Sequence, residues 1–531
     1  MHLKPNAPAV AHHGKTVIGF NWIGGRELEG DLPSFDAKSA VDTRDTVGIF
    51  PECGERDVDK AAKAAALAFR GWSETSPAVR GAVIGRIAAH LDLHKAQVAA
   101  VITREIGKTP REALAEVQEA IDVCLCFHSE GWRLGDQRSP TVQDGHRRPL
   151  GVVAIMAGNS SPLAAPIWRL IPAILYGNTV VWKPSVNAAT TAYLFIRCLM
   201  DAGLPAGVVN VVNGKGKAGC GKFFLAGIDK GFYQKFCFTG STPMGRLIGE
   251  LAGRNLMVPS LELGGKNPMI VMPDCDLDQA VQGALCGAFG SGGQRRTSLA
   301  NLIVHQDVAA AFRDKFLAAV AALELGNPVT HPDVFFGPMI NPRFGKAFEE
   351  HWALGREDGA TLLCGGARWH EDNRTAQVHG FITKGIYMQP CVWEGLTPDM
   401  KLFQTEVFGP TVNLCTVADF DQALAWSNAT RYGLSSAIHT EKRDWIERFK
   451  RESNAARVSI NGACSGLEGH LPFGGNGWSG NGTREGGSWT LESYTRWHSV
   501  DDDAPARLRQ ARLDPDYSTG TQYELSHWDR L

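Results

Sequence analysis

Residues 289–298 read FGSGGQRRTS, a glycine-rich turn that continues into two arginines. A turn of this composition usually presents one small reactive side chain to a ligand, and here Arg295 and Arg296 stand in its place. An arginine guanidinium stays protonated and has no lone pair to donate, so it cannot act as a nucleophile. The turn therefore has the form of a nucleophile loop but lacks a nucleophile.

A second candidate site lies in FCFTGSTPMGRLIGEL, residues 236–251. The pattern predicts a strand that ends at Gly240, followed by a helix with Ser241 and Thr242 at its cap and Pro243 in its first turn. Such a helix start offers free N–H groups and the positive end of the helix dipole, which suits a pyrophosphate. Capped strand–helix turns also occur in α/β proteins that bind no nucleotide, and the Gly-x-Gly-x-x-Gly fingerprint is absent as a strand–helix turn.

Short valine-rich strands and helices alternate around these motifs. Residues 151–261 contain one such series, which predicts a doubly wound parallel sheet covered by helices. A second series from residue 268 to about 471 predicts a second α/β domain. Helical patterns precede both, over residues 58–72, over 78–107, and from there to about residue 132.

The composition is that of a soluble globular protein. The chain has 531 residues, of which 44% are hydrophobic and 21% charged, and its net charge of −2 gives no electrostatic basis for binding nucleic acid or an anionic membrane. Residues 151–182 form a long apolar run, but prolines and a glycine interrupt it, which favours two buried strands around a helix over a membrane span. The N-terminal segment lacks the apolar core of a signal peptide, so a cytoplasmic location is expected.

The twelve cysteines follow no disulfide framework. Cys124 and Cys126 form the only close pair in the sequence, a C-x-C on an apolar helical stretch, which is neither a zinc nor a redox signature. Buried thiols in a reducing compartment are therefore expected. The sequence predicts no metal site.

Six motifs occur in an order that resembles the aldehyde dehydrogenase superfamily over roughly residues 17–500. They are VVWKPS (180–185), FTGSTPMG (238–245), LELGGKNP (261–268), FGSGGQRRTS (289–298), EVFGP (406–410) and PFGGNGWSGNGTREGG (472–487). Their combination is far more specific than any single motif, and their style is similar to the semialdehyde-oxidising branch. The resemblance implies an α/β fold with a Rossmann-like cofactor domain, a second α/β catalytic domain and a β-structured oligomerisation arm.

The resemblance also implies how the chain is divided. The implied bounds are 1–132 and 151–261 for the dinucleotide-binding domain, 262–475 for the catalytic domain, 133–150 and 476–500 for the arm, and 501–531 for a C-terminal extension. Extended segments of the family's arm pair between subunits, so a homodimer or a dimer of dimers is implied.

The implied cofactor is NAD or NADP. The residues assigned to it are Lys183 at the adenine ribose, Gly216 near the adenine, Gly240 and Ser241 at the pyrophosphate, Leu263 in the same groove, Glu406 at the nicotinamide ribose and Phe408 beside the nicotinamide. Family members that prefer NAD often carry glutamate directly after Lys-Pro-Ser, where this chain has Val186. Without that carboxylate the choice between NAD and NADP stays open.

Aldehyde oxidation in this family is covalent, and the chain matches its requirements only in part. A cysteine thiolate attacks the aldehyde carbonyl, a hydride leaves, and a carboxylate activates the water that hydrolyses the thioester. Glu262 in LELGG matches that carboxylate. The family's cysteine stands two residues after the glutamine of Gly-Gln, and this position holds Arg296.

The oxyanion donor also departs from the family pattern. An asparagine two residues before a proline normally holds the oxyanion together with a backbone N–H. In GVVAIMAGNSSP that position is Ser160, and Asn159 precedes it. Either the Ser160 hydroxyl donates a weak hydrogen bond to the oxyanion, or a local shift of the chain brings Asn159 to that position. Cys464, near the family's substrate entrance, offers a thiol, but a small residue on the pocket wall is the favoured interpretation.

Two hypotheses follow for Arg296. Family geometry directs Arg296 and Glu262 into the same small volume, so the guanidinium would pair with the carboxylate and mask the base. A fixed cation beside an oxidised nicotinamide ring would also repel it, so the reduced cofactor would bind more tightly. The alternative is that Arg296 turns outward to solvent and has no role.

Three functional interpretations stay open. The first is an NAD(P)-dependent dehydrogenase of a small aldehyde or semialdehyde with very low activity, because losing a nucleophile costs on the order of a millionfold in turnover. The second is a pseudoenzyme that binds a nucleotide or a partner protein. The third is a single-base change, since cysteine and arginine codons can differ by one base. No acid-binding residue stands out to identify the aldehyde.

Overall fold

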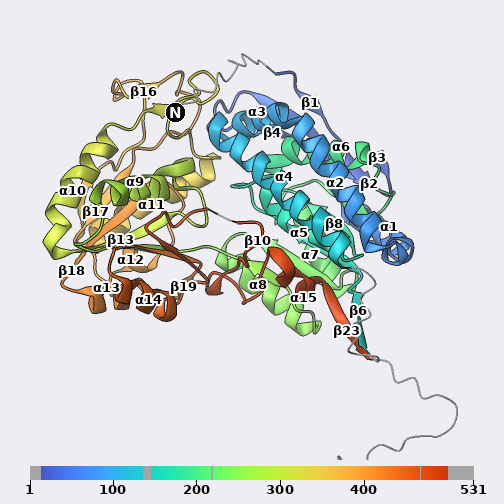
Figure 1. Ribbon diagram of the computed structural model, residues 1–531. Helices are drawn as coiled ribbons and strands as arrows, with labels where there is room; N and C mark the ends of the chain where they lie inside the picture. Colours follow the sequence, from blue (N-terminus) through green and yellow to red (C-terminus); the bar gives the residue numbers. More distant parts are fainter. Residues whose placement is uncertain (1–13, 135–144, 217–218, 467, 500–531) are drawn as a thin grey trace, which may run out of the picture. The chain divides into compact units, whose positions relative to one another are not determined.

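The computed structural model describes residues 14–134, 145–216, 219–466 and 468–499 (Figure 1). The expected C-terminal extension, residues 501–531, lies outside the described residues. The chain divides into a large unit, which contains both main sheets, and a small unit that includes most of the strands β6 (Gly145–Pro149) and β23 (Thr495–Ser499). Within the described residues, no helix is both long and apolar enough to cross a membrane.

The first main sheet has seven strands in the order β11-β10-β7-β8-β9-β2-β3. Its strands are β2 (Asn21–Ile23), β3 (Arg26–Leu28), β7 (Val152–Met156), β8 (Thr179–Lys183), β9 (Val209–Val211), β10 (Lys235–Thr239) and β11 (Ser260–Glu262). The strands from β7 to β11 run parallel, while β2 and β3 add an antiparallel edge. The doubly wound parallel sheet expected over residues 151–261 is therefore present.

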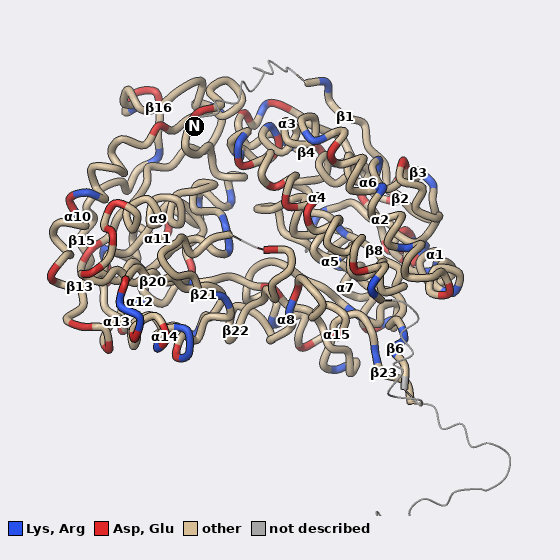
Figure 2. Tube along the Cα trace, in the orientation of Figure 1, with Lys and Arg blue, Asp and Glu red and all other residues tan. Residues whose placement is uncertain are grey.

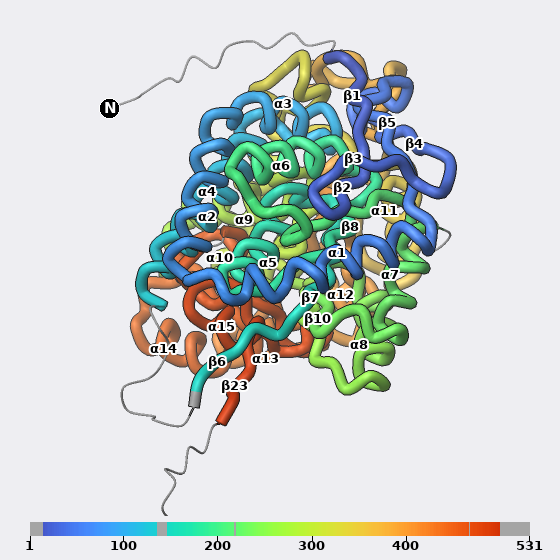
Figure 3. Tube along the Cα trace, turned by 90° about the vertical axis from the view of Figure 1, so that its right-hand side faces the viewer, coloured from blue at the N-terminus to red at the C-terminus, as the bar shows by residue number. Residues whose placement is uncertain are grey.

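Helices cover both faces of this sheet, so its strands are buried on both sides (Figures 1 and 3). One face packs on α1 (Glu55–Glu74), α7 (Cys220–Asp229) and α8 (Thr242–Arg254), and the other on α2 (Pro77–Leu93), α3 (Lys95–Ile106), α4 (Pro110–Arg133), α5 (Ala164–Leu175) and α6 (Ala189–Asp201). Two-sided burial explains why the strands read as continuous apolar runs. Residues 151–182 form β7, α5 and β8, as expected.

One N-terminal helix differs from the expectation. The sequence predicts a single helical pattern over residues 78–107, whereas the structure has α2 and α3 with a break at His94. His94 has φ −104° and ψ 13°, so it ends α2 and begins α3. The apolar pattern continues across the break because both helices bury one face against the same core. The third expected helix is α4, which begins with a capping box formed by Thr109 and Glu112.

The second main sheet also has seven strands, in the order β15-β17-β18-β13-β12-β20-β21. Its strands are β12 (Asn267–Val271), β13 (Leu299–His305), β15 (Thr361–Cys364), β17 (Cys391–Glu394), β18 (Thr411–Val417), β20 (Ser435–His439) and β21 (Arg457–Ile460). All of them run parallel to their neighbours except β15, which is antiparallel to β17. This is the second α/β series expected from the sequence.

Helices cover both faces of the second sheet as well. One face carries α9 (Leu277–Phe289) and α10 (Gln306–Ala321), and the other α11 (Pro342–Glu357), α12 (Lys401–Gln404), α13 (Phe420–Ser427) and α14 (Arg443–Glu452). Smaller sheets join β1 (Val17–Ile18), β5 (Thr46–Glu52) and β4 (Leu32–Lys38), β14 (Leu325–Gly326) and β16 (Val378–His379), and β19 (Tyr432–Gly433) and β22 (Asn476–Gly477). The remaining described elements are α15 (Thr490–Tyr494) and short 3₁₀ turns at Val186–Ala188, Gly290–Gly293 and Gly487–Trp489.

The small unit contains a two-stranded sheet of β6 (Gly145–Pro149) and β23 (Thr495–Ser499), which lie side by side in Figures 1 and 3. The Arg147 guanidinium lies 4.3 Å from the centre of the Trp497 ring, and the His146 and His498 rings are 4.9 Å apart. These strands fall in the expected oligomerisation arm, whose pairing between subunits stays a prediction. Charged residues of both signs are interspersed along the described chain (Figure 2).

Candidate active site

The glycine-rich loop follows α9 and leads into β13 as a tight turn. Ser291, Gly292 and Gly293 have φ of 52°, 61° and 66°, in the left-handed region of backbone space. Glycine is required at 293, because a Cβ there would lie 2.0 Å from the carbonyl oxygen of Gly409. The carboxylate of Glu112 accepts hydrogen bonds from the Ser291 N–H at 2.6 Å and its hydroxyl at 2.9 Å. The first turn of α4 therefore fixes the start of the loop.

Asn267 fixes the end of the same loop. Its Nδ2 donates to the carbonyl oxygens of Arg296 and Ser298, both at 2.8 Å, and its Oδ1 accepts from the Ser435 N–H at 3.1 Å. Since Asn267 begins β12 and Ser435 begins β20, the loop backbone is tied to the centre of the second sheet. The direction in which the two arginines leave the loop follows from these anchors.

The two arginines of the loop point to different partners. Arg295 makes a 2.8 Å ion pair with Glu112 and donates to the Ser291 hydroxyl at 3.0 Å, and 32% of its side chain is exposed. Arg296 turns inward, with 16% of its side chain exposed, and its Nη1 lies 3.4 Å from Glu262 Oε2. The hypothesised ion pair is therefore present, and the alternative of a solvent-facing Arg296 is wrong.

Glu262 ends β11 and is completely buried. Burial and, to a smaller extent, the nearby Glu485 raise the pKa of its carboxyl to about 8, against the opposing influence of the Arg296 cation. Its second oxygen, Oε1, has no hydrogen-bond partner among the described residues. Burial likewise lowers the pKa of Arg296, and Glu262 opposes that shift. A buried carboxyl of this kind can exchange a proton near neutral pH.

A second buried ion pair lies beside the first. Arg169 of α5 and Glu485 are both almost inaccessible to solvent, and Arg169 Nη2 lies 2.7 Å from Glu485 Oε1. Sequence reasoning did not assign either residue to the site. Two signals could have found them: Arg169 is the only charge in the apolar run of residues 151–182, and Glu485 lies in the quoted REGG segment.

These groups adjoin a cavity of about 380 Å³. Its lining includes four arginines, Lys108, four glutamates, Ser160, Ser161 and the aromatic rings of Trp168 and Phe473; the charged members are Arg111, Arg169, Arg295, Arg296, Lys108, Glu112, Glu116, Glu119 and Glu485. Ser160 lines this cavity, whereas Asn159 beside it does not and is buried with 9% of its surface exposed. The role of either residue as oxyanion donor stays a prediction. The Arg296 guanidinium lies 5.7 Å from the centre of the Phe473 ring.

The residues assigned to the adenine side of the cofactor lie at strand ends of the first sheet. Lys183 is the last residue of β8, and its buried Nζ donates to the Pro184 carbonyl at 3.0 Å. Burial lowers the pKa of this amine. Gly240 follows β10, and Ser241 is the N-cap of α8 without a side-chain hydrogen bond to the helix. Gly216 is exposed in the loop after β9, next to residues outside the described ones.

The remaining residues assigned to the cofactor are Leu263, near the middle of the chain, and Glu406 and Phe408 in its second half. Glu406 Oε1 accepts from the Gly265 N–H at 3.3 Å, and burial raises the pKa of this carboxyl to about 7. Phe408 packs against Phe344 with ring centres 5.1 Å apart. Leu263 is buried directly after Glu262, and its N–H donates to the Ser479 carbonyl at 2.8 Å.

Cys464 is not a replacement nucleophile. It is fully buried, its thiol donates to the Pro268 carbonyl at 3.3 Å, and burial raises its pKa to about 12. A thiol with this pKa is almost entirely protonated at neutral pH, so it is a poor nucleophile.

Comparisons with known proteins agree with this geometry. The model of the aldehyde dehydrogenase family matches residues 29–500. The chain is 34% identical to the alpha-ketoglutaric semialdehyde dehydrogenase of Bacillus subtilis over 489 residues, which cover 91% of this chain and 96% of that protein. It is 32% identical over 487 residues to the alpha-ketoglutarate semialdehyde dehydrogenase of Haloferax volcanii, with 91% and 97% covered. The crystal structure of betaine aldehyde dehydrogenase from Staphylococcus aureus in complex with NAD+ matches with a TM-score of 0.85 and 26% identity over 92% of this chain and 96% of that one.

Proposed function

Because the chain belongs to the aldehyde dehydrogenase family, we propose that it binds NAD or NADP together with a small aldehyde or semialdehyde. The reaction of this scaffold is oxidation of the aldehyde to a carboxylic acid. The observation that carries the proposal is Glu262, a buried carboxyl with a pKa of about 8 in contact with Arg296, which lines a cavity of about 380 Å³. A base with this pKa is suited to take a proton from water near neutral pH.

The residues of the cofactor groove fit a dinucleotide. The first turn of α8 has no side-chain cap, so its N–H groups are available to a pyrophosphate. Lys183 and Glu406 offer a cation and a carboxylate for hydroxyl groups of the two riboses. The backbone at Gly264 closely approaches the Glu406 carboxylate, because a Cβ at Gly264 would lie only 1.9 Å from Glu406 Oε2. When bound, NAD(P) supplies the hydride acceptor. The NAD+ complexes of the Staphylococcus aureus enzyme and of an indole-3-acetaldehyde dehydrogenase support this cofactor.

We further propose that Arg296 stands at the position of the family's catalytic cysteine. The covalent step then has no nucleophile, because the guanidinium has no lone pair to give and Cys464 is buried and protonated. Glu262 keeps its place, but its carboxylate is engaged by Arg296 at 3.4 Å. Thiol-dependent oxidation by this chain should therefore be very low, lower by on the order of a millionfold than with the cysteine present.

The charges of the cavity favour a substrate with a carboxylate, as in a semialdehyde. Lys108 pairs with Glu116, and the lining arginines 169, 295 and 296 each pair with a glutamate. Arg111 also lines the cavity, and no ion pair or hydrogen bond engages its side chain within the part of the chain that the structure describes. It is exposed and can meet an anionic group of a ligand.

The alternative proposal is a pseudoenzyme that binds a nucleotide or assembles with a partner. The ion pair of Arg296 and Glu262 favours it, because it occupies the space in which a thiol and its base would act.

We also propose the domain division given by the resemblance, with the cofactor domain ending near residue 261 and the catalytic domain following it. The first main sheet ends with β11 at Glu262 and the second begins with β12 at Asn267, which supports this boundary. The pairing of β6 with β23 supports an oligomerisation arm, and light scattering would distinguish a homodimer or tetramer from a monomer.

The decisive experiment is NAD(P)H formation over a panel of aldehydes, matched in length with and without a terminal carboxylate. It compares the chain with Arg296→Cys and with the control Arg296→Ala, and calorimetry measures cofactor binding by all three. We expect activity in Arg296→Cys alone, with preference for the carboxylate-bearing aldehydes. Equal activity of the unmodified chain would contradict the role given to Arg296. Cofactor binding without activity in any variant would favour the pseudoenzyme, and no cofactor binding at all would refute the proposal.

A further inference from the structure

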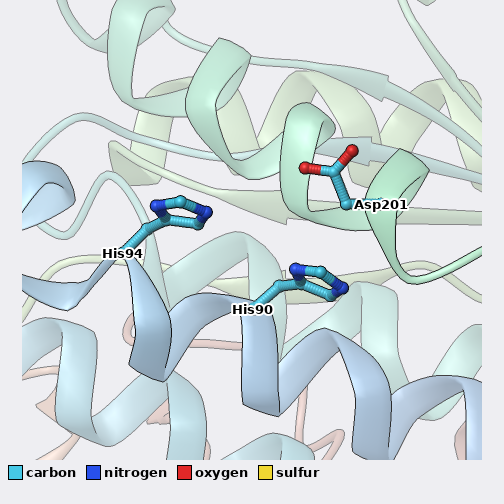
Figure 4. Close-up of side chains that lie close together, drawn as sticks. All are labelled: His90, His94 and Asp201. Carbon is cyan, nitrogen blue, oxygen red and sulfur yellow. The ribbon is translucent and has the colours of Figure 1, made fainter.

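Two helix ends bring together three side chains of metal-binding type, none of which belongs to the candidate active site. His90 lies in the last turn of α2 and His94 is its C-cap, while Asp201 is the last residue of α6 (Figure 4). Each residue offers one ligand atom, a ring nitrogen or a carboxylate oxygen, and these three atoms all lie within 4.8 Å of one another. The sequence predicts no such site because Asp201 is more than 100 residues from the histidines.

The local fold explains why the three side chains meet. Residues four apart on a helix share one face, so His90 and His94 point to the same side even though helix α2 ends between them. α2 and α6 pack in the same hydrophobic core through residues such as Ile87 and Leu199. In addition, Arg86, one turn before His90, donates from Nε to the Ala202 carbonyl at 2.8 Å, which fixes the end of α6 beside α2.

The three ligand atoms are available. Within the described residues, no hydrogen bond or ion pair engages the side chain of His90, His94 or Asp201. The two histidines are half-buried and Asp201 is exposed. A histidine near a helix C-terminus is favourable by itself, because its cationic form interacts with the helix dipole. That explanation does not account for a carboxylate at the C-terminal end of α6, where a negative charge is unfavourable.

We propose that His90, His94 and Asp201 form a binding site for a divalent transition-metal ion, with Zn²⁺ as the best-suited ion. Two imidazole nitrogens and one carboxylate oxygen are ligands that zinc accepts at about 2.0–2.2 Å, with water completing the tetrahedron. Imidazole ligands also favour Zn²⁺, Co²⁺, Ni²⁺ and Cu²⁺ over Mg²⁺ and Ca²⁺. Ligands at such bond lengths lie roughly 3.4 Å apart in a tetrahedron, so the side chains must close by at most about 1.4 Å. Side-chain rotation, above all of the exposed Asp201, supplies that movement.

The bound ion would join the break between α2 and α3 to the end of α6. Glu105 of α3 already accepts hydrogen bonds from the N–H groups of Thr190 and Thr191, in the first turn of α6. The metal would therefore add a second tie at the opposite end of α6. This site is independent of the proposed dehydrogenase function, since none of its residues lines the active-site cavity.

The test is titration of the full-length protein with Co²⁺, followed by visible absorption, and with Zn²⁺, followed by calorimetry. His94→Ala and Asp201→Asn each remove one ligand. His370→Ala is the matched control, because His370 is exposed on a different part of the described chain. A double variant, His12→Ala with His13→Ala, controls for the adjacent histidines near the N-terminus, which lie outside the described residues.

We expect one equivalent of Co²⁺ with the intense visible bands of a four- or five-coordinate ion, displaced by Zn²⁺. Loss of an outer-shell partner costs about 10–100-fold in metal affinity, so His94→Ala, which removes a ligand, should weaken binding by at least that factor. Asp201→Asn should weaken it in the same direction, and the two histidine controls should bind as the unmodified chain does. Binding that is unchanged in His94→Ala, or that disappears in the His12 and His13 variant, would overturn the proposal, as would a protein that binds neither ion.

Discussion

The cofactor groove and the aldehyde cavity depend on different parts of the chain. The groove uses strand ends and the uncapped N-terminus of α8, so most of its capacity to bind a dinucleotide lies in backbone groups. The cavity depends on individual side chains, because six of its charged residues form three ion pairs with one another. One residue can therefore decide the chemistry of the cavity while the groove keeps its form. Under the proposed function, Arg296 is such a residue.

The two buried ion pairs at the cavity also differ from each other, in their distances and in their exposure to solvent. Arg169 and Glu485 are 2.7 Å apart and almost inaccessible, whereas Arg296 and Glu262 are 3.4 Å apart with 16% of the arginine side chain exposed. The first pair is shorter and more enclosed, although neither Arg169 Nη2 nor Glu485 Oε1 makes a hydrogen bond within the described residues. In the second pair Arg296 Nη1 donates a long hydrogen bond to Glu262 Oε2. We infer that the Arg169 pair is a structural requirement and that the Arg296 pair can be replaced without loss of the fold.

The largest expected effect concerns Glu262, the proposed general base. In the Arg296→Cys background, adding Glu262→Gln should lower kcat by about 10²–10⁴-fold, the usual contribution of a general base. In Arg296→Cys itself, kcat/KM should rise with pH and reach its midpoint above about 8, because removing the Arg296 cation removes an influence that lowers the pKa of Glu262. Steady-state kinetics from pH 6 to pH 10 would measure both effects.

Glu29→Gln is the matched control for this prediction, since Glu29 is exposed and lies in the first sixth of the chain, away from the cavity lining. Its activity should equal that of Arg296→Cys alone. A pH profile that survives Glu262→Gln would assign the base to another group.

The two sheets, whose strand ends form the groove, were predictable from the sequence. Many of the side-chain contacts around the cavity were not. Alternating valine-rich strands and helices predict both sheets, since a strand buried on two faces reads as an apolar run. The motifs place Glu262 and Arg296 near each other, and the structure has them in contact. The break at His94 was missed, because the apolar face of the helix continues through it.

The pairing of Arg169 with Glu485 was missed for a different reason. Their separation of more than 300 residues leaves no local pattern, and only the folded chain brings α5 beside the segment that contains Glu485. The partner of Arg295 is a case of the same kind, since Glu112 caps the start of α4 in the structure and also serves as the anchor of a distant loop. Long-range electrostatic contacts of this sort require coordinates.

The next largest effect concerns the two ion pairs. Arg169→Met should destabilise the protein by about 3–5 kcal/mol, because it leaves the buried Glu485 without its partner. Arg296→Met should cost clearly less, since the Arg296 side chain is 16% exposed and its pair with Glu262 is longer, at 3.4 Å, than the 2.7 Å pair of Arg169 with Glu485. Urea unfolding followed by circular dichroism at pH 7 would compare the two variants. Equal destabilisation would contradict the distinction between the pairs.

A smaller effect is expected in the cofactor groove. Glu406→Gln should weaken NAD(P) binding by about 10–100-fold, because hydrogen bonds to a charged group contribute about 1.5–3 kcal/mol. The loss should be the same in the unmodified chain and in Arg296→Cys if groove and cavity are separable. Calorimetry of both backgrounds would measure this. A loss that appears in only one background would show that the Arg296 charge, which lowers the pKa of Glu406, couples the two regions.

The smallest effect concerns the oxidation state of the cofactor. Arg296 is a buried cation whose charge is only partly offset by Glu262 at 3.4 Å, so it should disfavour the positively charged oxidised nicotinamide relative to the neutral reduced ring. A residual interaction on the order of 1 kcal/mol corresponds to a roughly fivefold preference for the reduced form. Arg296→Ala should remove that preference, whereas Arg295→Ala should keep it, because the Arg295 charge is engaged by Glu112 at 2.8 Å. Equal affinities of the unmodified chain for the two forms, measured by calorimetry, would mean that Glu262 neutralises Arg296 completely, and the groove would then be electrostatically independent of the substituted residue.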